Sequence, residues 1–152
     1  MTGSPLSFIF KHKGENTMLK KTITYTDYNG VERTEDFYFN LSKGEIIEME
    51  LTTEGGYIEM INKITAAQDH ITLFKIFKDL ILKSYGQKSL DGKRFEKSEK
   101  LYTEFTQTEA YSVLLGELCT NAEAAAAFIN GVIPSNLGES AKNADQSTLL
   151  TA

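Results

Sequence analysis

The sequence predicts an α+β fold, in which an N-terminal β-hairpin precedes a mostly α-helical bundle of about five helices, with flexible termini. Residues 20–41 alternate apolar and polar side chains around an Asn-Gly turn, which is typical of two half-buried antiparallel strands. From residue 42 to 134 the apolar side chains recur with a helical period instead. Strands followed by a run of helices are typical of the α+β class.

Length and composition indicate one ordinary globular domain. The chain has 152 residues, of which 41% are hydrophobic and 24% are charged. Its formal net charge of -5 argues against binding of nucleic acid through phosphates. The most basic stretch, residues 93–100, is interrupted by Glu96 and Glu99, so we interpret it as a solvated surface.

The cysteine content and the hydropathy pattern favour a cytosolic protein. Cys119 is the single cysteine, so no internal disulfide can form, and its apolar helical surroundings predict a buried, inert thiol. No stretch reaches the roughly 18 apolar residues that span a membrane. The apolar run at residues 5–10 is too short for a secretory signal and has no basic residue before it.

The two predicted strands cover residues 20–27 and 31–41. A three-residue loop ending at Gly30 pairs Asp27 with Val31 and places all odd-numbered side chains on one face. A two-residue Asn-Gly loop would set the apolar face of one strand beside the polar face of the other, so we prefer the longer loop. Since a lone hairpin is marginally stable in water, it must dock on helices or on strands of a partner.

Three helices are predicted between residues 42 and 85. A capping box at residues 42–45 opens the first, which Gly55 and Gly56 end. The second carries an amphipathic i, i+3, i+4, i+7 series at Tyr57, Met60, Ile61 and Ile64.

Asp69 can cap the third helix, which is predicted to run to about Tyr85. Its apolar residues cover most of the circumference: Ile71, Leu73, Phe74, Ile76, Phe77, Leu80, Ile81 and Leu82. Such a helix is either central in the core or covered by a binding partner, and both interpretations stay open here.

The remaining elements are a break and further helices. Residues 87–97 are predicted to form a loop or a short second hairpin. Ser98 starts a helix that Thr108 restarts. A second capping box at residues 120–123 opens an alanine-rich helix at 122–130, which Gly131 ends and Pro134 keeps from resuming.

Three segments follow from this pattern. Residues 18–134 form the predicted domain, and the aperiodic, polar residues 135–152 are predicted to be a flexible tail. Residues 1–17 are expected to be a leader that is disordered or not native. The codons of residues 13–15 can contain the core of a bacterial ribosome-binding site at a normal spacing before Met18.

The sequence offers no strong signal for catalysis, a metal site or a cofactor, and we expect none of them. His12 and His70 are isolated, and nothing local supports Cys119 with His70 as a nucleophile and base. The acidic residues of the first helix are interpreted as a solvated face: Glu45, Glu48 and Glu50.

The predicted hairpin is rich in aromatic side chains, namely Tyr25, Tyr28, Phe37, Tyr38 and Phe39. Sheets that bind single-stranded nucleic acid use such aromatics for stacking. Here three acidic side chains interrupt the aromatic series, at residues 32, 35 and 36. We therefore favour a protein contact or a core role.

Six ordered blocks of sequence carry a further indication. They are MLKKTITYTDYNGVERTEDFYFNLSKGEI, ELTTEGG, AAQD, IFKDLILKSYGQKSLDGKRFEKS, FTQTEAYS and AAAFINGVIP. These blocks cover nearly all of residues 18–134, and they resemble the tail assembly chaperones of siphophages that infect Gram-positive bacteria.

The resemblance implies a non-enzymatic role in the host cell cytoplasm. Such proteins are thought to coat the long, helical, aggregation-prone tape measure protein before tail tube subunits polymerise around it. In many such phages a frameshifted, longer form recruits the tail tube protein, and the polar tail here could be the unshifted ending. A homo-oligomer is a further expectation, whereas nucleic acid and membranes are not expected as partners.

Two groups of residues are candidates for protein binding or self-association, although all of them could be core residues instead. They are Tyr25, Phe37, Tyr38 and Phe39 in the hairpin, and Ile71, Phe74, Phe77, Leu80 and Ile81 in the third helix. The alternative function is a structural tail component or adaptor that is retained in the virion.

Overall fold

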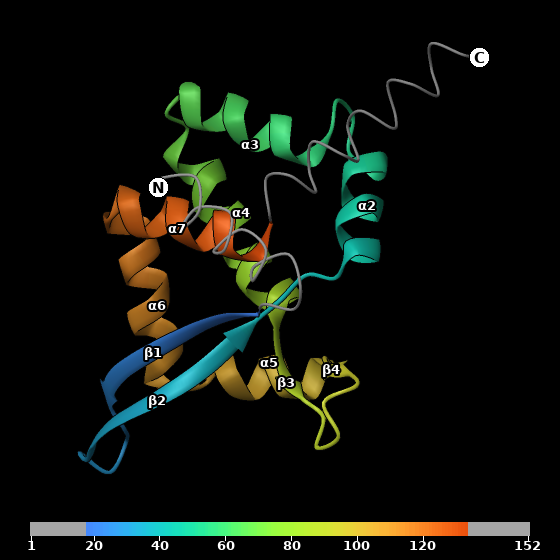
Figure 1. The fold of residues 1–152 in the computed structure, drawn as a ribbon. Coiled ribbons are helices and arrows are strands. Elements are labelled where there is room, and N and C mark those ends of the chain that lie inside the picture. The colour runs from blue at the N-terminus through green and yellow to red at the C-terminus, as the bar shows by residue number, and fades with distance from the viewer. Residues whose placement is uncertain (1–17, 134–152) are drawn as a thin grey trace, which may run out of the picture.

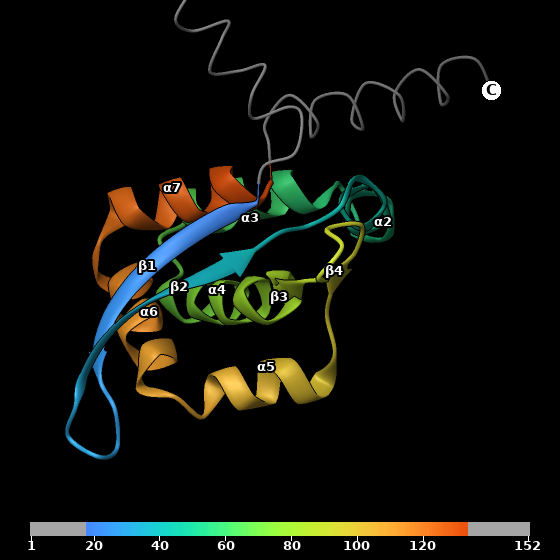
Figure 2. The same cartoon turned by 60° about the horizontal axis from the view of Figure 1, so that its bottom comes forward.

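The computed structural model describes residues 18–133, and the expectations for the leader and the tail lie outside this range. The described chain forms a four-stranded antiparallel sheet of order β1-β2-β3-β4 and six helices (Figures 1 and 2). The elements are β1 (Leu19–Thr26), β2 (Glu32–Phe39), α2 (Lys43–Thr52), α3 (Tyr57–Ala66), α4 (His70–Ser84), β3 (Tyr85–Lys88), β4 (Phe95–Glu96), α5 (Glu99–Thr106), α6 (Glu109–Thr120) and α7 (Ala122–Val132). The predicted α+β class is confirmed.

The first hairpin has the predicted register. Tyr25 pairs with Arg33, and the Asp27 N–H donates to the Val31 carbonyl at 2.8 Å. Gly30 adopts a φ of 81°, the left-handed conformation that the end of a three-residue loop requires. The Arg33 guanidinium donates to the Asp27 carboxylate, and this hydrogen bond lowers the pKa of that carboxyl.

One face of the hairpin lies against the helices, and the other is exposed. β1 contacts α6 and α7, and Figure 2 shows the β1–β2 ribbon in front of these helices. Lys21 of β1 forms an ion pair with Glu117 of α6 at 3.2 Å. The outer face carries cross-strand polar pairs, such as Thr24 with Thr34 at 2.9 Å. The hairpin therefore docks on helices of its own chain.

Residues 85–96 form the second hairpin that the sequence offered as one of two options. α4 ends at Ser84, one residue earlier than predicted, and Tyr85 begins β3. Gly86 pairs with Tyr38, so β3 extends the sheet beyond the first hairpin. Leaving the helix here lets the Tyr85 ring stack on the Phe105 ring, with centroids 4.4 Å apart and planes within 10°.

Four of the predicted helix starts are confirmed by side-chain caps. Ser42 and Glu45 form the capping box of α2. Asp69, Ser98 and Thr108 cap α4, α5 and α6 through their side-chain oxygens. Because Thr108 opens a separate helix, the described residues contain six helices where the sequence predicted about five.

The last helix begins at Ala122 as predicted, but its predicted capping residue and its predicted end are wrong. Asn121, and not Thr120, accepts from the Ala124 N–H at 3.0 Å, because Thr120 is still the last residue of α6. α7 then continues through Gly131 to Val132. A Cβ at Gly131 would lie 2.8 Å from Cδ1 of Leu19, so this glycine makes room for β1 rather than ending the helix.

Glu50 is buried, which corrects the prediction of a solvated acidic face on this helix. Its side chain is 9% exposed, and it accepts from the Ile58 N–H at 2.8 Å. Gly56 at the N-cap of α3 has no side chain to do this, so the carboxylate of α2 caps α3 instead. Only Glu48 of the three carboxylates matches the expectation of full exposure.

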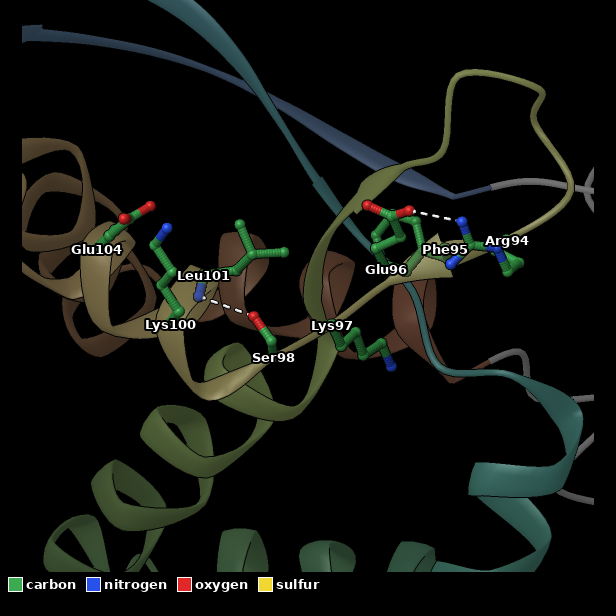
Figure 3. Close-up of a pocket in the computed structure, with 8 residues that line it drawn as sticks. All are labelled: Arg94, Phe95, Glu96, Lys97, Ser98, Lys100, Leu101 and Glu104. Carbon is green, nitrogen blue, oxygen red and sulfur yellow. Dashed lines mark hydrogen bonds and ion pairs between the residues drawn. The ribbon is translucent and has the colours of Figure 1, made fainter.

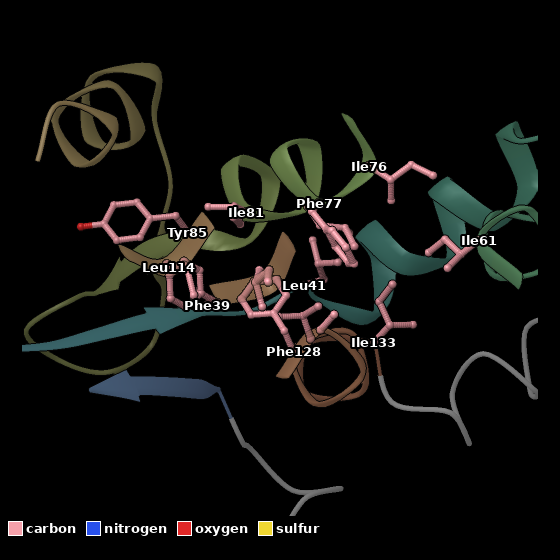
Figure 4. Packing of buried hydrophobic residues seen from close by; sticks show 14 of the residues in the cluster. Phe39, Leu41, Ile61, Ile76, Phe77, Ile81, Tyr85, Leu114, Phe128 and Ile133 are labelled. Carbon is pink, nitrogen blue, oxygen red and sulfur yellow. The ribbon is translucent and has the colours of Figure 1, made fainter. Parts of the chain in front are cut away.

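The core centres on aromatic rings from four elements. Phe39 of β2 is fully buried, and its ring lies 5.7 Å from Tyr85, 5.9 Å from Phe105 and 5.4 Å from Phe128, measured between centroids. Figure 4 shows Phe39, Tyr85 and Phe128 together with Leu114 in this packing. These contacts join the sheet to α5 and α7.

A salt bridge joins α2 to the segment after β4. The Lys97 Nζ lies 2.7 Å from Oε1 of Glu45, and the Lys97 side chain is only 22% exposed. Burial raises the pKa of the Glu45 carboxyl, but hydrogen bonds from Lys97 and Ser42 outweigh burial and hold this pKa below its usual value. Lys97 is therefore not part of a solvated basic surface.

We expect Gly86→Ala to destabilise the fold. A Cβ there would lie 2.6 Å from the Glu96 carbonyl oxygen and 2.7 Å from the Phe95 ring, so strand β4 would have to move. The free energy of unfolding in urea should fall by about 1–3 kcal/mol. Gly116→Ala is the control, because it has open space in the interior of α6 and should raise the free energy of unfolding by up to about 1 kcal/mol. Equal effects of the two substitutions would contradict this account.

We expect the Glu45–Lys97 pair to stabilise the fold above acidic pH. The pKa of Glu45 is lowered in the folded state, so its contribution is present above the unfolded pKa and is lost as the pH falls through the folded pKa. Glu45→Gln keeps a side chain that can close the capping box but removes the charge. Its Tm should be below that of the original chain at pH 7, and the difference should vanish towards about pH 3.

Glu48→Gln is the matched control for this measurement, because Glu48 lies exposed on the same helix. A pH-independent difference for Glu45→Gln would show that the ion pair is not its source.

Candidate functional site

The predicted binding residues of α4 divide into two groups. Phe77, Leu80 and Ile81 are buried in the core. Ile71 and Phe74 are 71% and 41% exposed, and their i, i+3 spacing puts them side by side on the helix. The core interpretation therefore holds for Phe77, Leu80 and Ile81, whereas Ile71 and Phe74 lie outside the core.

The hairpin candidates lie mostly inside the molecule. Phe39 is fully buried, whereas Tyr25, Phe37 and Tyr38 are half-buried. The Phe37 ring lies 5.2 Å from the Phe105 ring, and the Tyr25 hydroxyl donates to Glu35 at 2.7 Å. This contact with Glu35 raises the pKa of Tyr25. Tyr25, Phe37 and Phe39 thus join the hairpin to the core, and among the described strands β1 lies at the edge of the sheet.

A groove lies between α3, α4 and the junction of α6 with α7, elements that converge at the upper left of Figure 1. Its volume is about 450 Å³. Its lining residues are Ile61, Asn62, Thr65, His70, Leu73, Phe77, Leu118, Cys119, Thr120, Ala122, Ala125, Ala126, Ile129 and Asn130. No carboxylate, lysine or arginine is among these described residues, so the groove suits an apolar, uncharged occupant.

Phe74, one of the exposed residues of α4, lies on the side of the helix that lines this groove. Phe74 lies four residues after His70 and three before Phe77, and both of these line the groove. Residues at these spacings share one side of a helix. We refer to Ile71 and Phe74 as the α4 rim. The groove and the α4 rim together make the candidate protein-docking surface.

Cys119 is exposed, so the prediction of a buried thiol is wrong. Leu118 faces the core instead, while Cys119 and His70 both line the groove. The prediction treated every apolar residue near the end of α6 as buried, but only some of them face the core. The tertiary structure therefore puts the cysteine in the same groove as one histidine.

A second exposed apolar pair was missed by sequence reasoning. Ile47 and Leu51 of α2 are 40% and 58% exposed and lie one turn apart. The signal was present, because Ile46, Ile47 and Leu51 cannot all share one face of a helix.

The basic stretch forms part of a shallow pocket beside β4 and α5, shown in Figure 3. The pocket has a volume of about 730 Å³ and lies among Arg94, Phe95, Glu96, Lys97, Ser98, Lys100, Leu101 and Glu104. Arg94 pairs with Glu96 at 2.9 Å, and Lys97 pairs with Glu45. With acidic side chains paired to two of its cations, this stretch is poorly suited to a phosphate group.

Residues 18–133 were also searched for metal ligands and membrane spans. Within this range no group of three or more His, Cys, Asp or Glu side chains could hold a metal ion. None of the individual helices described is long and apolar enough to cross a membrane. α6 and α7 would suffice only together, and the chain bends by 111° between them.

Comparison with known proteins identifies the family of the chain. The family model described as "Phage tail assembly chaperone" matches residues 18–151, which is most of the chain. Its match begins at Met18 and continues beyond α7 into the residues that follow the described range. No curated protein and no solved structure shows significant similarity to the chain. Because this family model matches most of the chain, the chain belongs to the phage tail assembly chaperone family.

Proposed function

We propose that this chaperone binds the tape measure protein of its phage in the host cytoplasm and keeps it soluble during tail assembly. The observations that support the proposal are the groove without a charged side chain in its lining and the exposed apolar residues of the α4 rim. A tape measure protein that awaits its tube is expected to be a long helix with an exposed apolar stripe. An apolar surface without charged side chains can accept such a stripe.

The small side chains in one wall of the groove favour a helix as the bound element. Ala122, Ala125 and Ala126 of α7 supply small side chains along one wall. Small side chains let two helices approach closely, because the interaxial distance depends on the residues at the contact. Ile71 and Phe74 would add large apolar contacts at one end.

Each copy of the chaperone would bind only a short part of the client. Burial of one large apolar side chain contributes roughly 1.5–3 kcal/mol, so two or three anchors give weak binding once ordering costs are subtracted. Several copies along one rod would raise the overall avidity. We therefore include self-association in the proposal, with the open edge of β1 as the candidate contact.

Recruitment of tail tube subunits is the second half of the proposed role. The resemblance to siphophage chaperones implies that a frameshifted, longer form of the protein carries it out. The domain at residues 18–133 would then hold the client while the added segment binds the tube subunit.

Co-expression with the tape measure protein of the same phage tests this function. With the original chaperone, a tape measure protein that is insoluble alone should become soluble and co-purify. Ile71→Ser combined with Phe74→Ser should reduce the co-purified client severalfold, because it makes the α4 rim polar without touching the buried core.

The matched control is Ile47→Ser with Leu51→Ser, which changes a similar apolar pair on α2. This variant should retain the client. A client that stays insoluble with the original chaperone would refute the proposed function, and equal loss in both variants would refute the assignment to the α4 rim.

A further inference from the structure

The loop between β3 and β4 holds Leu90 in solvent on an ordered turn. Leu90 is fully exposed, whereas Ser89 before it is only 6% exposed. The Ser89 hydroxyl donates to Oδ1 of Asp91 at 2.7 Å and accepts from the Arg94 N–H at 3.0 Å. The Gly92 N–H donates to the Ser89 carbonyl at 2.9 Å. These hydrogen bonds fix the turn, which projects from the lower edge of the domain in Figure 1.

The conformation of this turn does not require a leucine. Tight turns favour Gly, Pro, Asn, Asp and Ser, because these residues adopt the turn conformations or form hydrogen bonds within them. A fully exposed leucine also contributes little to packing within its own chain. An apolar side chain on an ordered turn is well suited to contact another molecule, because little conformational freedom is lost on binding. Leu90 is therefore a candidate anchor for a protein partner.

We propose that Leu90 of one copy of this chain inserts into a pocket beside α2 of a second copy, and that the two copies do so reciprocally. This α2 pocket has a volume of about 290 Å³ and is lined by Leu41, Glu45, Glu48, Met49, Thr52 and Lys83. Ligand pockets span roughly 300–1,000 Å³, so a pocket of this size suits one side chain better than a larger ligand.

The proposed contact differs from the edge of β1 that the proposed function names for self-association. Its use in placing several copies along one client rests on that proposed function. The contact itself depends only on residues that the structure describes.

The charges beside Leu90 are mainly basic. Lys88 and Lys93 lie two residues before it and three after it, and both are exposed. The Asp91 carboxylate is bound within the loop, since its Oδ1 accepts from the Ser89 hydroxyl and from the Lys93 N–H at 3.0 Å. The tip of the loop therefore combines an apolar anchor with flanking cations, and it should bind an apolar site with carboxylates at its border.

The α2 pocket has this character. Leu41 and Met49 supply its apolar lining, and the exposed Glu48 supplies a carboxylate that can meet a cation of the other copy. Lys83 also lines the pocket, but its Nζ lies 3.2 Å from a carboxylate oxygen of Asp79, which offsets its charge. The loop and the α2 pocket are therefore complementary in both charge and apolar character.

The other two hollows described above fit the loop less well. The groove between α3, α4 and the α6–α7 junction has no carboxylate among its described lining residues, so it offers nothing to the lysines. The pocket beside β4 and α5 is lined by Arg94, Lys97 and Lys100, which would repel them. Charge therefore selects the α2 pocket as the site for Leu90.

The base of the loop lies next to the α2 pocket on the same molecule. Lys97 directly follows β4, and its Nζ lies 2.7 Å from Oε1 of Glu45, which lines the pocket. Leu90 is nevertheless fully exposed, so it does not fill the pocket of its own chain. When an anchor and an acceptor site lie close together on one surface, two copies can face each other across a twofold axis. Each copy then fills the pocket of the other, and the assembly closes as a dimer.

Sedimentation velocity of the full chain tests this contact. The chain should be a monomer at low concentration and increasingly a dimer at high concentration, because two small apolar contacts give weak association. Leu90→Ser should lower the association constant by about tenfold or more. Val113→Ser is the matched control, because it changes an exposed apolar residue on α6 and should leave the association constant unchanged.

A mixing experiment separates direct contact from misfolding. Glu48→Lys places a cation at the α2 pocket and should also weaken the dimer. Each variant keeps the half of the contact that the other has lost. An equimolar mixture of Leu90→Ser and Glu48→Lys should therefore form more dimer than either variant alone. Both residues are exposed, so circular dichroism should show the same fold for both variants.

Four outcomes would overturn the proposal. The first is a chain that stays monomeric at every concentration. The second is a dimer that persists in Leu90→Ser, which would assign self-association to another surface such as the edge of β1. The third is a mixture that associates no better than its components, and the fourth is growth beyond the dimer, which would replace the closed pair with an open chain. The assay contains no client, so a failure of client binding would leave its result unaffected.

Discussion

The packing of Phe105 against Phe39 and Tyr85 is the interaction on which the rest of the fold depends. Phe105 is contributed by a helix of only eight residues, and an isolated helix of that length is not stable in water. Its ring stacks on Tyr85 and meets Phe39 edge-on, so α5 is held by the sheet it covers. The same contact sets the end of α4, because Tyr85 must leave the helix to reach this position.

The candidate binding surface is a consequence of that arrangement. Phe74 lies seven residues before Ile81 and therefore on the same side of α4, but it is 41% exposed whereas Ile81 is fully buried. The bend of 111° between α6 and α7 then carries the alanine-rich face of α7 past α3 and α4. The groove between them needs no charged residue in its lining. The same four helices, α3, α4, α6 and α7, thus contribute both to the core and to the groove.

Local patterns predicted the parts of this structure that depend on neighbours in sequence. The hairpin register followed from the requirement that odd-numbered side chains share a face, and the helix starts followed from side chains that cap free amide groups. The errors arose where a distant segment intervenes. Gly131 was predicted to end the last helix, but it lies inside α7, where its missing side chain makes room for Leu19. Glu50 was predicted to be solvated, but its carboxylate accepts a hydrogen bond from the Ile58 N–H at the start of α3. The sequence identified the apolar residues of α4 as candidates, but it did not predict which of them are exposed.

The sequence by itself determined that a hairpin precedes the helices, the register of that hairpin, the caps of α2, α4, α5 and α6, and the apolar character of α4. These depend on periodicity and on hydrogen bonds within a few residues. Only the tertiary structure decided that β3 joins β2, that Cys119 is exposed and lines one groove with His70, and that Ile71 and Phe74 are exposed. The physical reason is that burial is a property of the whole packing, since a side chain is covered or exposed according to elements that lie far away along the chain.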